Sequence, residues 1–402
     1  MLSCFEESNS DFSCSLWDSS AEGWNSILDR VLKAPTDSEI LSPLIEKVGS
    51  DYIIHYDILG LTYWMLARVE EIDSKEIDEH GRFLTSSSHA YKNGYIDRPI
   101  VDEWLYILGQ VMIRQWPHIK LKVNSPKILI SHDVDHPSRF TFCSKIRFIK
   151  RLIGDIVKRK IFGSLIFSLI ARYSSLSEIS HLDRWNTFDW LMDKSEENGL
   201  KSAFYFQAGL SEKRIDADYR IDEDSIKNLI KKISNRGHEI GFHPSYHAGS
   251  SVDVFRKEVD LFHQCCKELN IIQESWGGRM HYLRLNTKET FQKWADNGFN
   301  YESSLGFADC PGFRCGTCFE YEALDPIQDK IYDLVIRPLI VMDCSVFTEK
   351  ILKSKFDCNN KLNSIHNLKI KCFKVGGNFT LLWHNNFFET KRMKEIYSEL
   401  LK

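Results

Sequence analysis

The stretch ILISHDVDHPSRF, residues 128–140, decides the fold class because an apolar, β-prone run ends in a cluster of charge. Asp133 and Asp135 lie two residues apart, so strand alternation turns both carboxylates to the same side. A buried carboxylate is costly unless it is paired. The two aspartates therefore lie either at an exposed strand end or beside a cation.

From Lys127 onward the chain alternates between strand-like and helix-like patterns. The strand patterns cover residues 127–135, 202–210, 238–243, 274–285, 332–343 and 378–386, and the helical patterns cover 222–237, 252–269 and 287–298. This alternation predicts an α/β fold with parallel strands, either a barrel or a doubly wound sheet. In both folds, functional side chains collect at the carboxyl ends of the strands.

Residues 1–120 show no such rhythm. Apolar residues recur at helical spacing in 57–71 and 100–116, and a polar, loop-like stretch separates the two segments. We therefore expect a smaller N-terminal α+β domain at 1–120, followed by a larger α/β domain at 126–402.

The composition is that of an ordinary globular protein, with 402 residues, 43% hydrophobic and 27% charged. The net charge of −4 gives no global footprint for nucleic acid, so we expect no nucleic-acid partner. The N-terminus has neither a basic start nor an apolar core, which predicts a cytoplasmic protein. The pair Cys315 and Cys318 forms one C-x-x-C, which local packing explains better than zinc or redox chemistry.

A basic segment lies inside a helical insertion expected around residues 139–200. Between residues 139 and 172 the sequence has nine Lys or Arg residues and one acid, Asp155. It could form a basic amphipathic helix on an anionic membrane. We favour a solvated helix packed on the barrel, because charge runs are usually exposed faces. Peripheral membrane contact through 139–172 remains the alternative.

A second informative stretch is RGHEIGFHPSYHAGS, residues 236–250. Pro244 favours a helix that begins near His243, and the i, i+4 spacing then places His243 and His247 on one face, as two ligands of one metal. Two surface histidines would fit the spacing equally well. Together with the D-x-D pair, the histidines match a hydrolytic zinc site with three protein ligands, an open position and a spare carboxylate as general base.

These residues resemble a known family. HDVDH (132–136) followed by GHEIGFHPSYH (237–247) resembles the polysaccharide deacetylase superfamily, or NodB-homology domain. LLWHNN (381–386) and KSAFYFQAG (201–209) are similar to its last motif and its second strand. The D-x-D form and the N-terminal 120 residues resemble a branch from bacterial surface-polysaccharide clusters, in which an accessory domain of unknown role precedes the deacetylase.

The resemblance implies a distorted (β/α)7 barrel and a set of site residues. Asp133 would be the general base, His384 the general acid, and Asp135, His243 and His247 the metal ligands. Zinc is the first expectation, although manganese, cobalt, nickel or iron would accept the same ligands. The implied reaction removes an N-acetyl, less readily an O-acetyl, group from a sugar or glycan precursor in surface-glycan biosynthesis.

The sequence departs from the family at two motifs. The arginine that holds the base has no clean match, and GGRMHYLRL (277–285) offers Arg279, which we favour, and Arg284. The family's later acid corresponds to Glu302 or Asp309. Each of these residues also fits an ordinary ion pair at a barrel rim. We expect Tyr246, Glu302 and Arg284 at the substrate.

Three alternative functions compete with this one. Another amide C–N hydrolase on the same scaffold could use Glu302 to select a cationic, non-sugar substrate. A non-catalytic glycan-binding protein would lack a base or an acid, and the presence of Asp133 and His384 speaks against it. Nucleic-acid binding through 139–172 would show a steep dependence on salt.

Overall fold

The structure is a computed structural model that describes residues 5, 12–157, 168–170, 172, 178–287, 289–347, 355–388 and 390–402. Its strands are β1 (Cys14–Asp18), β2 (Val31–Pro35), β3 (Ile45–Val48), β4 (Asp51–Ile54), β5 (Ile128–Val134), β6 (Ser202–Phe206), β7 (Glu239–Phe242), β8 (Gly277–Gly278), β9 (Tyr301–Glu302), β10 (Tyr321–Asp325), β11 (Lys330–Ile336), β12 (Val341–Met342) and β13 (Phe379–Leu382). Its helices are α1 (Ile58–Leu66), α2 (His89–Lys92), α3 (Ile100–Gln115), α4 (Lys145–Val157), α6 (Phe188–Glu197), α7 (Asp224–Asn235), α8 (Val252–Glu268), α9 (Thr290–Asp296), α10 (Asp343–Val346), α12 (Lys355–Val375) and α13 (Lys391–Leu400).

The main sheet has nine strands, in the order β10-β11-β9-β8-β7-β6-β5-β13-β12. β5, β6, β7 and β8 pair in parallel, with Asp133 opposite Tyr205 and Phe242 opposite Gly278, while β10 and β11 form an antiparallel hairpin. This arrangement confirms the predicted α/β class. The strand order is open at β10 and β12, and among the described strands no pair closes it into a barrel.

The chain divides into two compact units. The first holds residues 1–128, 283–295 and 302–381, and the second holds 129–282, 296–301 and 382–402. Within the first unit, residues 14–115 contain two antiparallel strand pairs and α1 to α3, and they share one hydrophobic core. The predicted boundary near residue 120 remains a prediction, since the first unit also takes in two later segments.

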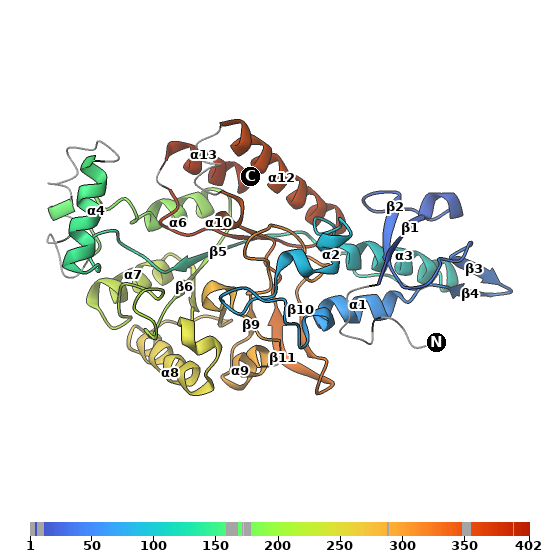
Figure 1. The fold of residues 1–402 in the computed structure, drawn as a ribbon, viewed down its shortest axis with the longest axis horizontal. Helices are drawn as coiled ribbons and strands as arrows, with labels where there is room; N and C mark the ends of the chain where they lie inside the picture. The colour runs from blue at the N-terminus through green and yellow to red at the C-terminus, as the bar shows by residue number, and fades with distance from the viewer. Residues whose placement is uncertain are drawn as a thin grey trace. The chain divides into compact units, whose positions relative to one another are not determined.

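The second unit is built around β5, β6 and β7, with α6, α7 and α8 around them (Figure 1). Every residue of β6 is buried, as expected for a parallel strand covered on both faces. The buried residues of α7 recur at helical spacing and turn one side inward. They are Ile226, Leu229, Ile230 and Ile233. The periodicities read from the sequence therefore predicted these elements.

Part of the predicted basic insertion is described. α4 and α6 are helical, whereas residues 158–167, 171 and 173–177 lie outside the described residues. Within the part of the chain that is described, no helix combines the length and apolar character needed to cross a bilayer. Cys315 and Cys318 are buried free thiols in the first unit.

Candidate metal centre and active site

The candidate site lies in the second unit, where residues follow the ends of neighbouring strands. Asp135 follows β5, Gln207 follows β6, His243 follows β7 and Arg279 follows β8. The sheet ladder continues into these residues, because the amide of His243 donates to Phe206 O at 2.9 Å and that of Arg279 to Phe242 O at 3.1 Å. The carboxyl ends of parallel strands meet at one edge, so these side chains converge.

Three side-chain nitrogens converge on one carboxylate oxygen, Asp135 Oδ1. It lies 3.3 Å from His243 Nε2 and 3.4 Å from His281 Nε2, and it accepts a 3.1 Å hydrogen bond from Gln207 Nε2. Asp135, His243 and His281 each offer one ligand atom, and these atoms all lie within 4.8 Å of one another. One carboxylate and two imidazoles form a donor set typical of zinc and related divalent ions.

Both imidazoles have a fixed orientation. His243 Nδ1 donates to the carbonyl of Arg279 at 2.7 Å, and His281 Nδ1 donates to Asp216 Oδ1 at 3.1 Å. In each ring Nε2 is therefore the nitrogen directed at Asp135. Among the described residues, the buried Nε2 of His243 has no well-aligned hydrogen-bond partner. An oriented histidine with an orphaned inward nitrogen is what a metal ligand requires.

The charges of the cluster also suit a cation. Burial opposes ionisation of Asp135, but nearby His281, His243 and His384 hold its pKa well below the usual value. Burial opposes protonation of His243, yet Asp133 and Asp135 outweigh it and raise the pKa of His243. The same two carboxylates that favour a proton on His243 would favour a bound cation in its place.

The second aspartate is held by an arginine. Asp133 Oδ1 accepts a 2.8 Å bond from Arg279 Nη1, and both side chains are buried. The other oxygen of Asp133, Oδ2, lies 3.9 Å from His243 Nε2. The guanidinium of Arg279 lies over the Tyr205 ring, 5.1 Å from its centroid. Of the two arginines that the sequence offered, the structure therefore places Arg279 on Asp133.

His384 reaches the same cluster from the end of β13. Its Nε2 lies 3.8 Å from Asp135 Oδ2, and its side chain remains 18% exposed. His132, which precedes Asp133 on β5, points away from the cluster, as strand alternation predicts. It is buried, donates from Nδ1 to Trp383 O at 2.6 Å, and has its pKa lowered to about 3 by burial.

The structure does not bring His247 to the group. Its side chain is 48% exposed, and its Nε2 lies 3.7 Å from Glu212. The predicted helix beginning at His243 is wrong, because Ser245 is extended, with ψ at 170°, and only a short 3-10 helix follows, Tyr246–Gly249. Without a regular helix, the i, i+4 spacing no longer places His243 and His247 on one face.

Side chains outside this segment fix its backbone. The amide of Ser245 donates to Glu258, that of Tyr246 to Asp216 and that of His247 to Ser211 Oγ, at 2.7, 2.7 and 2.8 Å. Each of these amides therefore bonds to a side chain rather than to a backbone carbonyl. Asp216 thus serves both this loop and the ring of His281.

His281 comes from a segment with unusual backbone geometry. The next two residues, Tyr282 and Leu283, have φ values of 61° and 54°, in the left-handed region that non-glycine residues avoid. Such conformations cost about 1–3 kcal/mol each and cluster at functional sites. The sequence does carry a signal for His281, since it follows Arg279 by two residues, as Asp135 follows Asp133.

Aromatic rings adjoin the cluster. The Tyr282 ring lies 4.8 Å from His281 and 5.7 Å from Tyr246, and Tyr282 is 37% exposed. Tyr246, expected at the substrate, is therefore near the metal group. Glu302 and Arg284 belong to the first unit, where Glu302 accepts a 2.8 Å bond from the Ser304 amide and Arg284 donates to His80 O at 2.9 Å. Their predicted contact with substrate remains a prediction.

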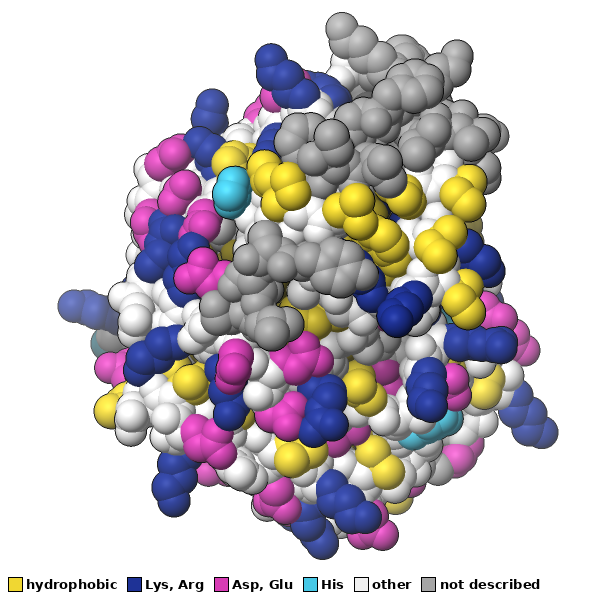
Figure 2. Space-filling model, turned by 90° about the vertical axis from the view of Figure 1, so that its left-hand side faces the viewer, with side chains coloured by type: hydrophobic (Ala, Val, Ile, Leu, Met, Phe, Trp, Pro, Cys, Tyr) yellow, Lys and Arg dark blue, Asp and Glu magenta, His cyan; other side chains and the backbone are white. Residues whose placement is uncertain are grey.

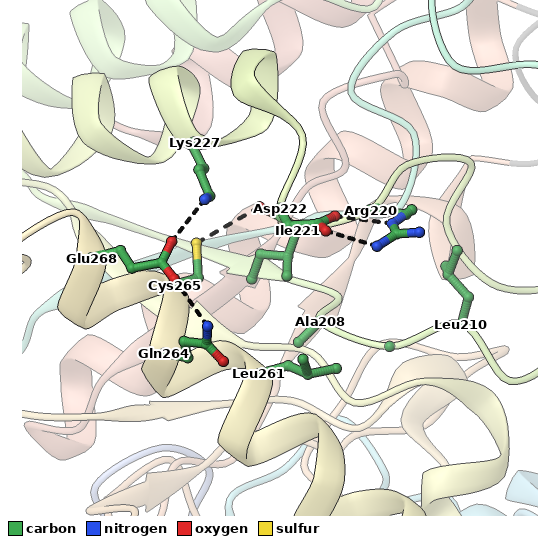
Figure 3. A pocket seen from close by; sticks show the side chains of 11 residues that line it. Ala208, Leu210, Arg220, Ile221, Asp222, Lys227, Leu261, Gln264, Cys265 and Glu268 are labelled. Carbon is green, nitrogen blue, oxygen red and sulfur yellow. Dashed lines mark hydrogen bonds and ion pairs between the residues drawn. The ribbon is translucent and has the colours of Figure 1, made fainter.

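A cavity of about 570 Å³ elsewhere in the second unit is a weaker candidate (Figure 3). Its rim charges neutralise each other, with Lys227 paired to Glu268 and Arg220 to Asp222, both at 2.7 Å. None of its lining residues belongs to the Asp135 group. Its polar groups are thus already satisfied within the protein.

The known proteins that match this chain either match only part of it or have low sequence identity to it. A family model described as a family of unknown function (DUF7033) matches residues 4–117. A search of curated proteins finds no match. A solved structure described as a "putative polysaccharide deacetylase from Mycobacterium smegmatis" has 16% identity and a TM-score of 0.43, covering 70% of this chain and 85% of that chain. These similarities leave the chemistry of the site as the basis for assigning an activity.

Proposed function

We propose that this protein is a divalent-metal-dependent carbohydrate deacetylase with Asp135, His243 and His281 as its metal ligands. The observation that carries the proposal is the convergence of two oriented imidazole nitrogens on Asp135, beside a second carboxylate held by Arg279. The motifs HDVDH and GHEIGFHPSYH, which resemble the polysaccharide deacetylase superfamily, support this reading. We further propose zinc as the metal and closure of the sheet into a distorted barrel.

The reaction divides between the residues of the cluster. A divalent ion bound there would polarise the acetyl carbonyl and make an attacking water more acidic. Asp133 accepts the proton of that water on Oδ2, because Arg279 occupies Oδ1 and fixes the carboxylate. His384, the partly exposed member of the cluster, protonates the departing amine. Water and an N-acetyl sugar thereby give acetate and an amino sugar.

The substrate is an acetylated sugar or glycan precursor. Tyr246 and Tyr282 supply aromatic surface beside the ligands, as sites for small polar molecules often do. A role in surface-glycan biosynthesis follows from the sequence resemblance alone. Another amide C–N hydrolysis on the same ligands is the competing activity.

The deciding experiment measures bound metal per chain in the wild type, His281→Ala and His247→Ala. We expect His281→Ala to lose the metal and His247→Ala to keep it, since only His281 lies in the group. The reverse result would restore the ligand set expected from the sequence and reject the one proposed here. Equal retention of metal in both variants would show that neither histidine is required.

The second arm measures acetate release from N-acetylated oligosaccharides. Asp133→Asn should retain metal and lose turnover by about 10²–10⁴-fold, as expected when a general base is removed. Full activity in Asp133→Asn would reject the base. A metal-loaded wild type that releases no acetate from any acetylated sugar, yet cleaves another amide, would reject the carbohydrate substrate and leave the metal site intact.

A further inference from the structure

Helix α4 carries apolar residues on two opposite sides. Phe148 and Leu152 turn inward, and the Phe148 ring packs 5.7 Å from that of Phe140. Ile146, Ile149 and Ile153 turn outward and are 69%, 52% and 54% exposed. A spacing of three and four residues aligns these isoleucines as one stripe along the helix. Three exposed isoleucines in one row are a contiguous apolar surface, unlike isolated surface residues.

The inward side is fixed by charge as well as by packing. Arg147 and Arg151 both pair with Asp218, the latter at 3.6 Å, and the Arg151 guanidinium lies over Trp185 at 4.7 Å. These contacts set the rotation of the helix about its own axis. The outward stripe is therefore a consequence of how α4 is held.

Cationic residues border the stripe. Lys145 and Lys150 are exposed, and neither makes an ion pair with the residues that the structure describes. Residues 139–154 contain no acid to oppose them. Figure 2 looks onto the side that carries α4 and shows hydrophobic side chains beside Lys and Arg on that face. An apolar stripe flanked by ammonium groups is complementary to a surface that is apolar below and anionic above.

We propose that α4 docks on an anionic lipid bilayer, with the stripe Ile146, Ile149 and Ile153 at the headgroup boundary and Lys145 and Lys150 at the lipid phosphates. A helix of this kind lies in the interface plane and gains both apolar burial and attraction to anionic lipid. The surface of three isoleucines on one helix is small compared with the roughly 800 Å² that each partner buries in a stable protein interface. This difference disfavours a second copy of the chain as the partner. The inference does not rest on the proposed function.

The test is co-sedimentation of the full chain with vesicles of phosphatidylcholine alone or mixed in equal parts with phosphatidylglycerol. We expect binding to the mixed vesicles, weaker binding to phosphatidylcholine, and loss of binding as salt rises. Lys145→Gln with Lys150→Gln should weaken binding at least about tenfold, because each cation near the surface contributes about one kcal/mol. Ile146→Ser with Ile149→Ser and Ile153→Ser should weaken binding to the mixed vesicles at low salt, although the charge of the helix is unchanged.

Matched controls use other exposed residues of the second unit. Arg256→Gln with Lys257→Gln on α8 makes the same change in charge, and Val252→Ser with Leu261→Ser and Ile272→Ser removes three exposed apolar side chains. Both should bind like the wild type. Equal binding by control and α4 variants would overturn the proposal, as would a wild type that ignores anionic vesicles. A wild-type dimer in solution that the triple serine variant makes monomeric would assign the stripe to a second copy instead.

Discussion

At the scale of single residues, the third metal ligand depends on which histidine has its ring held towards Asp135. Asp216 holds the ring of His281. Its Oδ1 accepts a hydrogen bond from His281 Nδ1 at 3.1 Å, and its Oδ2 accepts hydrogen bonds from the amides of Ser211 and Glu212 at 2.7 and 2.6 Å. Burial opposes ionisation of Asp216, but the bonds from His281 and the amides of Glu212 and Tyr246 lower its pKa to about 2. The carboxylate is therefore charged over the whole range in which the protein would bind metal.

Asp216→Asn should weaken zinc binding about 10–100-fold, because it removes the charge that orients His281 and raises its basicity as a ligand. Competition against a coloured chelator measures the affinity. The control is Asp222→Asn, an exposed aspartate of the same unit that pairs with Arg220. A melting temperature unchanged in Asp216→Asn would separate the effect on metal from an effect on folding. Wild-type affinity in that variant would remove Asp216 from the site.

The sequence predicted much of the site at this scale, for identifiable reasons. Alternation along a strand placed Asp133 and Asp135 on one side, and the structure holds both in one cluster with His243 and Arg279. The prediction of His247 as a metal ligand failed because it assumed a regular helix after Pro244. The amides of this segment instead donate to Glu258, Asp216 and Ser211, which lie 13 to 36 residues away in the sequence. Local sequence cannot reveal such partners.

At the scale of elements, the spacing between β7 and β8 decides whether His243 and Arg279 meet Asp133. Gly278 lies opposite Phe242 in this pair, and a Cβ on Gly278 would stand 1.8 Å from Phe242 O. The contact is with backbone, so a side chain cannot be accommodated by a change of rotamer. Gly278 thus permits the two strands whose ends carry His243 and Arg279 to approach.

Gly278→Ala should destabilise the second unit by about 1–3 kcal/mol or more, as overpacking does, and should lower metal affinity by displacing the strand ends. Thermal unfolding and metal content measure the two effects. Gly154→Ala on α4, where a Cβ would meet no atom within 4 Å, is the control. It should be neutral or stabilising, since alanine favours a helix over glycine by about 1 kcal/mol. A Gly278→Ala protein as stable and metal-rich as the wild type would contradict this account.

The predicted elements succeeded where periodicity was long. α7 and α8 fall within the predicted helices 222–237 and 252–269, and β6 within the predicted strand 202–210. Only the two residues of β8 form a strand within the extended segment predicted at 274–285, and a 3-10 helix with positive φ at Tyr282 and Leu283 follows at His281–Leu283. The antiparallel hairpin of β10 and β11 was also missed. Only residues 326–329 connect its two strands, so the missed signal was a local turn.

At the scale of the whole molecule, the first unit is assembled from segments far apart in the sequence. Glu71 pairs with Arg314, 243 positions later, through two bonds of 2.8 and 2.6 Å, and it also accepts from Arg68 Nε at 2.9 Å. All three side chains are at most 5% exposed. The predicted boundary near residue 120 relied on composition along the chain. Local composition cannot reveal an ion pair between residues so far apart in the sequence.

The buried pair of Glu71 and Arg314 makes the stability of the first unit depend on pH in the acidic range. Burial opposes ionisation of Glu71, but Arg314 and Arg68 outweigh it and lower its pKa to about 2, from 4.5. A depressed carboxylate pKa stabilises the fold above pH 4.5, and that stability is lost as pH falls from 4.5 towards 2. The shift corresponds to about 3 kcal/mol.

Glu71→Gln should therefore lower the stability of the first unit by about 3–5 kcal/mol at neutral pH, because two buried guanidinium groups lose a charged partner. It should also flatten the fall in stability between pH 4.5 and 2, since the titrating group is gone. Urea unfolding at several pH values, followed by tryptophan fluorescence, measures both effects. Glu39→Gln, an exposed site of the same unit, should behave as the wild type at every pH. A Glu71→Gln protein with wild-type stability at neutral pH and an unchanged acid slope would show that the buried ion pair does not hold the distant segments together.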